Sequence, residues 1–377
     1  MKSLVKFLAA LALAAFLPLA PTALAQDGGT LKIGFGGALL GDTASYGLSN
    51  LYGIEYAAAQ VNAKGGLLGR QLEIVTEDDS CRPDLAPEAA LKLANQGLKL
   101  ILGHTCSGAT RSALSSYSNR VILISSSATE VALTEDGASP YFFRTTPRDD
   151  AQATIQLKYV KQKGYKKVAI LHDKGDYGIA LAEKMQNDIK ADPGDIQIVL
   201  FQGITSGEVS YDDVVSLLRQ NEAEVLIWGG YYSDASKLIM QMRDKGLTTV
   251  VIGPDGLYNP SFITLGGTAV EGSVATGQAD LSNSEVAKAA IADHHTRHTE
   301  EIGPYFFYAA GAAQALFAAV EKAGTADDLD AIKKHLTEDT VETVMGPVRF
   351  DAKGDVIGAA FALYEIKDGN FSEIKMD

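Results

Sequence analysis

The sequence predicts an α/β fold built from two lobes, each a doubly wound parallel sheet. Strands rich in Val and Ile alternate with segments whose apolar residues recur at helical spacing, a pattern typical of parallel sheets with helices on both faces. This alternation runs once before Asp149 and once again after it. The 377 residues are enough for two ordinary domains. Two rounds of the same pattern therefore predict two lobes of similar construction.

The N-terminal segment has the three parts of a secretory signal peptide. Lys2 and Lys6 supply a positive region, residues 7–19 are apolar, and an A-x-A cleavage site ends at Ala25. The apolar run is too short for a comfortable membrane span, with an uncleaved anchor as the alternative. We therefore expect an exported protein that loses residues 1–25 by cleavage after Ala25.

The first round of elements starts at a strand over residues 31–35. Leu51, Ile54, Ala58 and Val61 then recur at helical spacing, and the following Lys-Gly-Gly ends that helix. Short apolar runs and amphipathic segments complete the round. They predict strands over 71–75, 98–102, 121–124 and 141–144, and helices over 87–95 and 109–117.

The second round repeats this pattern after Asp149. It predicts helices over 152–163, 179–189, 211–219 and 235–245, and strands over 168–171, 196–201, 225–228, 249–252 and 272–276. The remainder contains helical segments at 285–298 and 304–322 and strand-like segments at 347–350 and 361–366.

These last elements are too few for a third domain, so we expect the chain to return to the first lobe and then cross back. The expected division gives residues 26–147 with 278–354 to the first lobe. Residues 148–277 with 355–377 then form the second lobe.

The charge and the cysteines limit the function further. The net charge is −14, and it becomes about −16 once the two signal-peptide lysines are removed, so binding to nucleic acid is not expected. The two cysteines are Cys81 and Cys106. In an exported protein this even count is interpreted first as a disulfide, with a catalytic thiol as the alternative.

The loops that follow the predicted strands carry the polar chemistry. Ligands of open α/β sheets bind beyond the carboxyl ends of the strands. The first-half loops GHTCSG and SSSAT offer hydroxyls and free N–H groups at helix N-termini, which suit a carboxylate. The second-half loops HDKGDYG, GGYYSD and GPDG offer Tyr177, Tyr231 and Asp255. An acid facing a donor-rich loop predicts a ligand with both a carboxylate and an ammonium group.

Each of these residues also has an ordinary structural interpretation. Ser107 and Thr129 are common N-cap residues, and Asp255 is a common turn residue. Their joint occurrence at strand ends favours a binding site.

Several longer segments resemble the leucine/isoleucine/valine-binding protein family, the periplasmic solute receptors of ABC importers. They are VNAKGGLLGRQLEIVTEDDSC, ILGHTCSGAT, SSSAT, FRTTPRDD, VAILHDKGDYG, QGITSGE, WGGYYSD, GPDG and VETVMGPVRFDAKGD. The resemblance covers nearly the whole mature chain. It implies a type I periplasmic-binding-protein fold with a three-segment hinge, a periplasmic location, a permease partner and no cofactor. The implied ligand is a neutral aliphatic, branched-chain amino acid bound by a monomer.

The resemblance also implies roles for individual residues. Ser107 would bind the ligand carboxylate, Thr129 the carboxylate and ammonium, and the Ser127 carbonyl the ammonium. Asp255 would be the ammonium counter-ion. The remaining positions implied are Tyr177 and Tyr231 from the second lobe, Tyr46, Thr105 and Tyr305 around the ligand side chain, and a disulfide between Cys81 and Cys106.

Two positions depart from the family pattern. Asp255 stands where the family's leucine and valine binders carry Glu, which shortens the acid by one methylene. Thr105 replaces an apolar residue and places a hydroxyl beside the ligand side chain. An unpartnered hydroxyl in a dry pocket costs about 1–3 kcal/mol, so a smaller or more polar amino acid, or another small carboxylate, is an alternative ligand.

Other function classes find less support in the sequence. The run Gly34-Phe35-Gly36-Gly37 fails the dinucleotide pattern because Leu39 stands at the last glycine, and no G-x-S-x-G elbow occurs. His294 and His298 have the spacing of a zinc pair, but without H-E-x-x-H a solvated helix end is preferred and no metal is expected. An exported α/β hydrolase and a sensor module of the same fold are the rival hypotheses.

Overall fold

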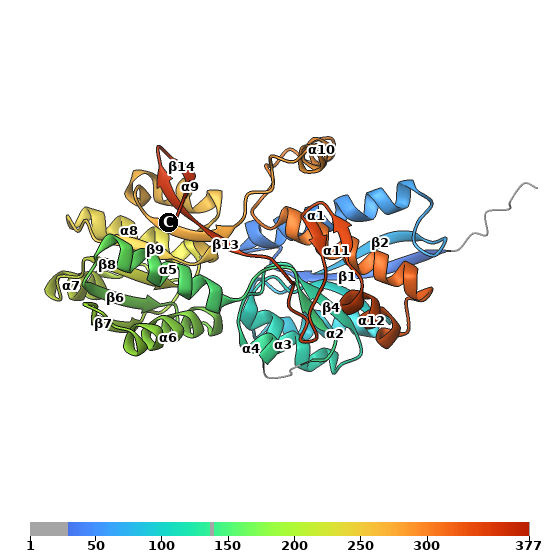
Figure 1. The fold of residues 1–377 in the computed structure, drawn as a ribbon, viewed down its shortest axis with the longest axis horizontal. Coiled ribbons are helices and arrows are strands. Elements are labelled where there is room, and N and C mark those ends of the chain that lie inside the picture. The colour runs from blue at the N-terminus through green and yellow to red at the C-terminus, as the bar shows by residue number, and fades with distance from the viewer. Residues whose placement is uncertain (1–28, 136–138, 377) are drawn as a thin grey trace, which may run out of the picture.

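The computed structural model describes residues 29–135 and 139–376, and within them it shows two lobes that lie side by side along the long axis of the molecule (Figure 1). The expected signal peptide and its cleavage site at Ala25 lie outside the described residues. None of the helices in the described ranges is long and apolar enough to cross a membrane.

The first lobe is built on a five-stranded sheet in which all neighbouring strands are parallel, in the order β2-β1-β3-β4-β5. Strands β3 and β4 are buried along their whole length, as their uninterrupted apolar sequences LILG and ILI predict. The strands are β1 (Thr30–Gly37), β2 (Gln71–Asp78), β3 (Leu100–Gly103), β4 (Ile122–Ser125) and β5 (Phe142–Arg144). The helices are α1 (Ala44–Ala63), α2 (Ala86–Asn95), α3 (Ser107–Tyr117), α4 (Ala132–Glu135), α10 (Glu285–His294), α11 (Phe306–Ala323) and α12 (Leu329–Glu338).

The second lobe is built on a seven-stranded sheet in the order β14-β13-β10-β9-β8-β6-β7. Five of its strands are parallel, and the C-terminal hairpin adds an antiparallel edge. The strands are β6 (Lys167–His172), β7 (Gln197–Gly203), β8 (Val225–Gly229), β9 (Val250–Gly253), β10 (Val274–Gln278), β13 (Phe361–Lys367) and β14 (Asn370–Ile374). The helices are α5 (Asp149–Lys163), α6 (Asp176–Ala191), α7 (Asp212–Gln220), α8 (Tyr232–Asp244), η1 (Asp255–Leu257), α9 (Pro260–Gly266) and η2 (Gly267–Val270).

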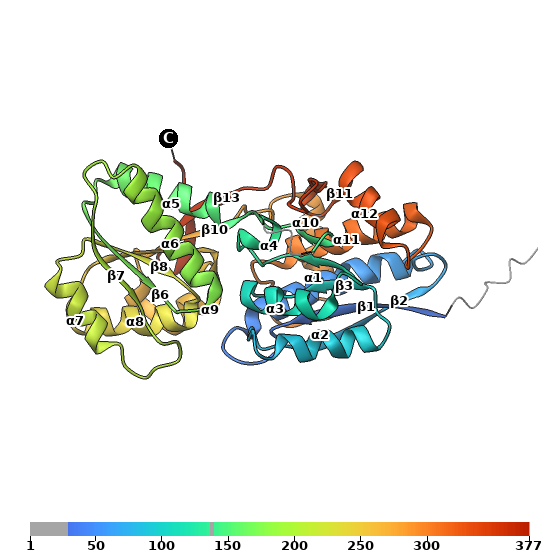
Figure 2. The same cartoon turned by 90° about the horizontal axis from the view of Figure 1, so that it is seen from below.

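The chain passes between the two sheets three times, after β5, after β10 and before β13 (Figure 2). A small hairpin of β11 (Val341–Thr343) and β12 (Gly346–Val348) precedes the last crossing. Just before that crossing, Asp355 forms an ion pair with the buried Arg144 at 2.5 Å, and Val356 bridges to Phe350. The third segment therefore stays attached to the first lobe until Val356.

The structure differs from the sequence predictions mainly at element ends. Helices α3, α5, α6 and α8 each begin two or three residues earlier than their apolar periodicity indicated. Their first turns face the region between the lobes instead of a lobe core, so no apolar stripe marks them. The predicted helix over 285–298 ends at His294, and α12 and β14 were not predicted.

Candidate functional site

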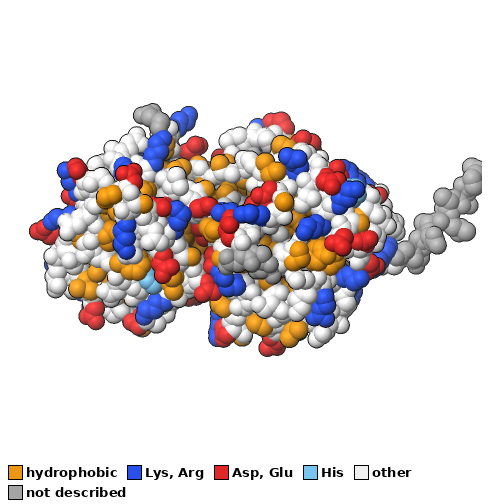
Figure 3. All heavy atoms as spheres, turned by 60° about the horizontal axis from the view of Figure 1, so that its bottom comes forward, with side chains coloured by type: hydrophobic (Ala, Val, Ile, Leu, Met, Phe, Trp, Pro, Cys, Tyr) orange, Lys and Arg blue, Asp and Glu red, His pale blue; other side chains and the backbone are white. Residues whose placement is uncertain are grey.

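Eight of the nine predicted ligand-binding residues line a buried cavity between the lobes. The lobes meet along a groove bordered by side chains of both charges (Figure 3). Little open space remains inside the cavity, about 10 Å³ for the centre of a water-sized sphere, so the lobes are closed on one another. Helices from both lobes begin at this point, so several partly positive helix N-termini converge on it. The lining residues are Tyr46, Thr105, Cys106, Ser107, Ser127, Tyr177, Tyr231, Asp255, Gly256 and Tyr305.

On the first-lobe side, Ser107 opens helix α3. Cys106 is the N-cap residue and makes no side-chain cap bond, so Ser107 is not the N-cap that the ordinary interpretation proposed. The Ser107 hydroxyl accepts a hydrogen bond from Glu130 N at 3.3 Å and keeps its own proton free to donate. The first N–H groups of α3 have no helical carbonyl to reach. The arrangement offers donors that suit an anionic group.

The neighbouring SSSAT loop is fixed by buried hydrogen bonds. The Ser127 hydroxyl donates to Thr105 O at 2.7 Å and accepts from Asn50 Nδ2 at 2.9 Å. The guanidinium of the buried Arg144 donates to the carbonyls of Ala128 and Glu130, at 3.3 and 2.6 Å. These bonds hold the backbone on either side of Thr129.

Thr129 lies beside this cavity without being one of its lining residues. Its hydroxyl is buried and has no hydrogen bond of standard geometry within the described part of the chain, yet it lies close enough to Asp149 to lower that group's pKa. It is therefore available to a ligand or to Asp149.

Two links tie the GHTCSG loop to the end of strand β2. Cys81 and Cys106 form the expected disulfide, with their Cα atoms 5.3 Å apart. Two residues before each cysteine, the fully buried Asp79 and His104 pair through Asp79 Oδ2 and His104 Nδ1 at 2.6 Å. The other ring nitrogen of His104 lies 3.0 Å from the hydroxyl of Tyr117. The loop that carries Ser107 is therefore held both covalently and by a buried polar pair.

On the second-lobe side, the carboxylate of Asp255 is completely buried and accepts four hydrogen bonds. Gln152 and Tyr177 donate to Oδ1 at 2.8 and 2.6 Å, and Gln278 and Tyr305 donate to Oδ2 at 3.1 and 2.9 Å. Burial raises the pKa of Asp255, and the four donors partly offset that effect. All four are neutral groups. A buried carboxylate held this way still favours a cation.

A second buried carboxylate, Asp149, lies nearby at the start of helix α5. Gln152 Nε2 donates to Asp149 Oδ1 at 2.9 Å and so bridges the two acids. Burial and the charge of Asp255 raise the pKa of Asp149 to about 8, and its Oδ2 has no hydrogen-bond partner among the described residues. A carboxyl group with this pKa is mostly protonated at pH 7, so Asp149 adds a second buried acid beside Asp255 but little negative charge.

Tyrosines close the site and join the lobes. Tyr46 of α1 donates to Gly256 O at 2.5 Å, and its ring centroid lies 5.8 Å from that of Tyr305. Gly53 allows α1 to approach α11 this closely, because a Cβ there would lie 2.2 Å from Phe306 O. Burial raises the pKa of Tyr46, Tyr177 and Tyr305 well above the usual value, so these hydroxyls stay neutral donors. The lobes are in direct contact across the cleft.

The hydroxyl of Thr105 has a partner that the sequence did not reveal. It accepts a hydrogen bond from Ala38 N, at the end of β1, at 3.3 Å. The cost expected for an unpartnered hydroxyl therefore does not apply.

Sequence reasoning missed Asp149, Gln152 and Gln278. Asp149 falls in the quoted segment FRTTPRDD, where its position directly before a helix was the available signal. Both glutamines reach Asp255 from elements that carry no motif, Gln152 one turn into α5 and Gln278 at the end of β10.

The histidines considered as a zinc pair have a structural arrangement. His294 Nε2 lies 2.6 Å from Glu300 O, and its ring stacks on that of His298 with centroids 4.9 Å apart. In residues 29–135 and 139–376, no three His, Cys, Asp or Glu side chains are grouped to hold a metal ion.

Comparison with known proteins places this architecture. Residues 30–370 match the family model described as periplasmic binding protein. The chain is 34% identical over 345 residues to the Leu/Ile/Val-binding protein of Escherichia coli, covering 91% of this chain and 92% of that one. It is 32% identical over 373 residues to the leucine-, isoleucine-, valine-, threonine- and alanine-binding protein of Pseudomonas aeruginosa, covering 98% of both.

Solved structures show the same fold. A leucine-binding protein from Thermotoga maritima superposes with a TM-score of 0.83 at 21% identity, covering 92% of this chain and 98% of that one. A branched-chain amino acid transporter substrate-binding protein from Streptococcus pneumoniae, solved with isoleucine, gives 0.81 at 24% identity and covers 92% and 100%. The type I two-lobed fold expected from the sequence is confirmed, and the chain belongs to the periplasmic binding protein family.

Proposed function

We propose that this protein is a periplasmic receptor that binds a neutral aliphatic amino acid, with a preference for branched chains, between its closing lobes. The observation that carries the proposal is the carboxylate of Asp255, buried opposite the N-terminus of α3 and held by neutral donors. A buried charge is expensive unless it is paired. The ammonium group of an amino acid supplies that pair.

The opposite wall suits the other end of the same ligand. Ser107 and the free N–H groups of α3 receive the carboxylate, with Thr129 between the carboxylate and the ammonium and the Ser127 carbonyl accepting from the ammonium. Tyr46, Thr105, Tyr177, Tyr231 and Tyr305 enclose the side chain. The small cavity and its aromatic walls favour a compact apolar side chain.

The relatives support this choice of ligand. Those with 32–34% identity are named as binders of leucine alone or of leucine, isoleucine and valine. One name adds threonine, and another adds threonine and alanine. The alternative of a smaller or more polar amino acid rests on that last relative, because the Thr105 hydroxyl is already engaged with Ala38 N. The fold does not decide the ligand, since a structure of the same fold from R. palustris was solved with benzoate.

The remaining expectations belong to the same proposal. The mature protein begins after Ala25, acts as a monomer without enzymatic activity, binds no nucleic acid and delivers its ligand to an ABC-transporter permease. Its lobes move as rigid bodies with boundaries near 147/148 and 277/278, and the third boundary, expected at 354/355, lies after Val356. Asp355 and Val356 move with the first lobe because they pair with Arg144 and Phe350.

Isothermal titration of ligand-free mature protein tests the proposal. Leucine, isoleucine and valine should bind, whereas leucinamide, which lacks the carboxylate, and 4-methylpentanoate, which lacks the ammonium, should each bind at least about tenfold more weakly, because each leaves one wall unpaired. Ser107→Ala should weaken the binding of leucine and change the binding of leucinamide little. If no amino acid binds, or if 4-methylpentanoate binds as well as leucine, the proposed pairing with Asp255 is wrong.

A further inference from the structure

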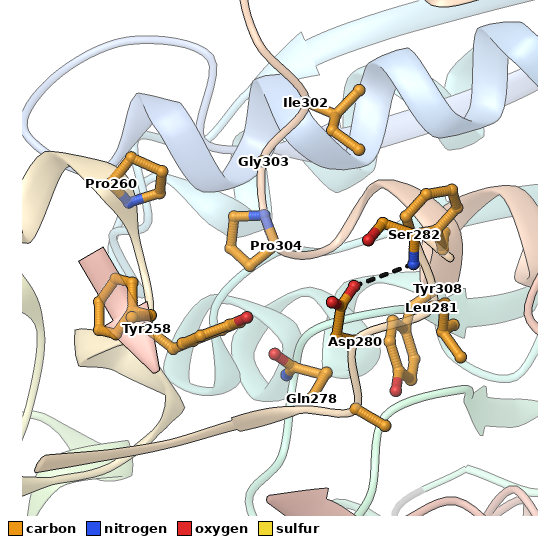
Figure 4. Close-up of a pocket in the computed structure, with 13 residues that line it drawn as sticks. Tyr258, Pro260, Gln278, Asp280, Leu281, Ser282, Ile302, Gly303, Pro304 and Tyr308 are labelled. Atoms are coloured by element: carbon orange, nitrogen blue, oxygen red, sulfur yellow. Dashed lines mark hydrogen bonds between the residues drawn. The ribbon is translucent and has the colours of Figure 1, made fainter. Parts of the chain in front are cut away.

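A second hollow, which we call the hinge pocket, lies where the chain crosses between the lobes (Figure 4). Gln278 lines it and donates a hydrogen bond to Asp255, which lines the proposed amino-acid cavity. The empty volume of the hinge pocket is about 620 Å³. Both lobes and two connecting segments contribute to it, and its lining residues are Tyr258, Pro260, Gln278, Ala279, Asp280, Leu281, Ser282, Ile302, Gly303, Pro304, Phe307, Tyr308 and Phe371.

One polar side chain that lines the hinge pocket, Gln278, carries an acceptor without a partner. Gln278 is 1% exposed, and its Nε2 donates to Asp255, which fixes the orientation of the amide. Its Oε1 has no hydrogen bond among the described residues. Figure 4 shows this oxygen directed into the space between Tyr258 and Pro304. A buried carbonyl oxygen without a donor costs about 1–3 kcal/mol, so a ligand that donates to it is favoured.

The electrostatics of the hinge pocket also select the ligand. Asp280 lies at its rim, where one carboxylate oxygen accepts from Ser282 N at 2.9 Å and the carboxylate stays exposed. Among the described residues that line the pocket, none is Lys or Arg. The pocket therefore presents acceptors and a negative charge, and it lacks the carboxylate receptor that Ser107 gives the amino-acid cavity.

Aromatic rings form the walls. Tyr258 lies between Tyr364 and Phe371, with ring centroids 4.4 and 4.8 Å away, and Phe307 and Tyr308 complete the opposite side. Aromatic faces attract organic cations and pack against apolar groups. We propose that the hinge pocket binds a small organic cation, an aryl- or alkylammonium without a carboxylate, whose N–H donates to Gln278 Oε1. This site does not depend on the proposed amino-acid ligand.

Titration of the mature protein with phenethylammonium chloride tests this inference, with 2-phenylethanol as the neutral isostere. The cation should bind with a dissociation constant below about 10 mM, and more tightly than the alcohol. Saturating leucine should not displace it, because the cation occupies a different cavity. Failure to bind at this concentration, equal binding of the alcohol, or competition by leucine overturns the proposal.

Variants locate the binding. Asp280→Asn keeps the acceptor for Ser282 N and removes the charge, so it should weaken the binding of the cation about threefold at low salt. Phe371→Ala removes an aromatic wall and should weaken it about fivefold. Asp244→Asn makes the same charge change at the exposed end of α8 and should have no effect. Leucine binding, unchanged in all three, checks the fold. Wild-type cation affinity in both pocket variants contradicts the site.

Discussion

The two walls of the amino-acid cavity are built differently. The first-lobe wall consists of short hydroxyl side chains and helix N–H groups on loops fixed by the Cys81–Cys106 disulfide, the Asp79–His104 pair and Arg144. The second-lobe wall carries long side chains around two buried carboxylates, Asp149 and Asp255. The first wall presents cross-linked donors suited to an anion, and the second presents buried acids, of which Asp255 would pair with a cation.

Because of this difference, we expect the first wall to contribute mainly to the stability of the fold and the second mainly to the affinity for the ligand. Cross-links in the first wall should contribute mainly to folding, because they constrain loops whether or not a ligand is present. The buried carboxylate of Asp255 in the second wall should oppose folding and contribute to binding, because it loses hydration and gains a cationic partner only when an ammonium group binds. The four predictions below test this contrast.

The largest effect is expected from Asp255→Asn. Removing the counter-ion should weaken the binding of leucine at least about 100-fold, which is the effect expected when one partner of a buried ion pair is lost. The ligand-free variant should be no less stable than the wild type, since burial disfavours the charged carboxylate. Calorimetric titration and urea unfolding measure both, with Asp244→Asn as the control. If the variant loses both stability and leucine affinity, Asp255 has a structural role like that of the cross-links in the first-lobe wall.

Breaking the disulfide should show the opposite balance. The double variant Cys81→Ser/Cys106→Ser opens a loop with a sequence separation of 25, which should cost about 3–4 kcal/mol of unfolding free energy. Leucine affinity should fall only a few-fold, because Asp79 and His104 still hold the loop. Urea unfolding at pH 7 measures the first quantity. A change below about 1 kcal/mol would mean that the polar pair alone fixes this wall.

The pH dependence of stability sharpens the description of the second wall. In the folded state the pKa of Asp149 is raised to about 8, whereas its unfolded value is about 4. The contribution of this protonated group to the free energy of unfolding is therefore fully present below about pH 4 and is lost as the pH rises through 8. The ligand-free variant Asp149→Asn has no carboxyl group at this position and does not lose this stability as the pH rises. Its melting temperature relative to the wild type should therefore increase between pH 4 and pH 8.

Comparison with the variant cancels groups away from the site, such as Asp173 with its raised pKa and His172 with its lowered pKa. Asp255 is coupled to Asp149 through its charge and Gln152, so the difference reports the titration of this pair. A constant difference between the two melting curves across this range would mean that Asp149 is ionised in the folded protein throughout.

Thr105→Val should have the smallest effect on binding. The Thr105 hydroxyl is engaged with Ala38 N, so the ratio of leucine to threonine affinity should change by no more than about threefold. The unfolding free energy should fall by about 1 kcal/mol because that N–H loses its partner. If the variant instead gains tenfold preference for leucine over threonine, the hydroxyl contacts the ligand side chain.

The sequence by itself determined the two lobes and the location of the site. Alternating apolar strands and amphipathic helices are local patterns, and the rule that ligands meet the carboxyl ends of parallel strands turned them into a set of loops. Ser107, Tyr177, Tyr231 and Asp255 were identified in this way, because hydroxyls and acids at strand ends can be seen in one segment at a time. The resemblance to a family added the residues around the side chain.

Only the tertiary structure decided how these groups are paired. Gln152 and Gln278 reach Asp255 across 103 and 23 residues of sequence, and Thr105 turns to Ala38 across 67. The first turns of α3, α5, α6 and α8 lack an apolar stripe, so periodicity placed these helices too late and left Asp149 outside the predicted helix. Hydrogen-bond partners and buried charge depend on which distant elements pack together, and a local sequence pattern contains no information about those contacts.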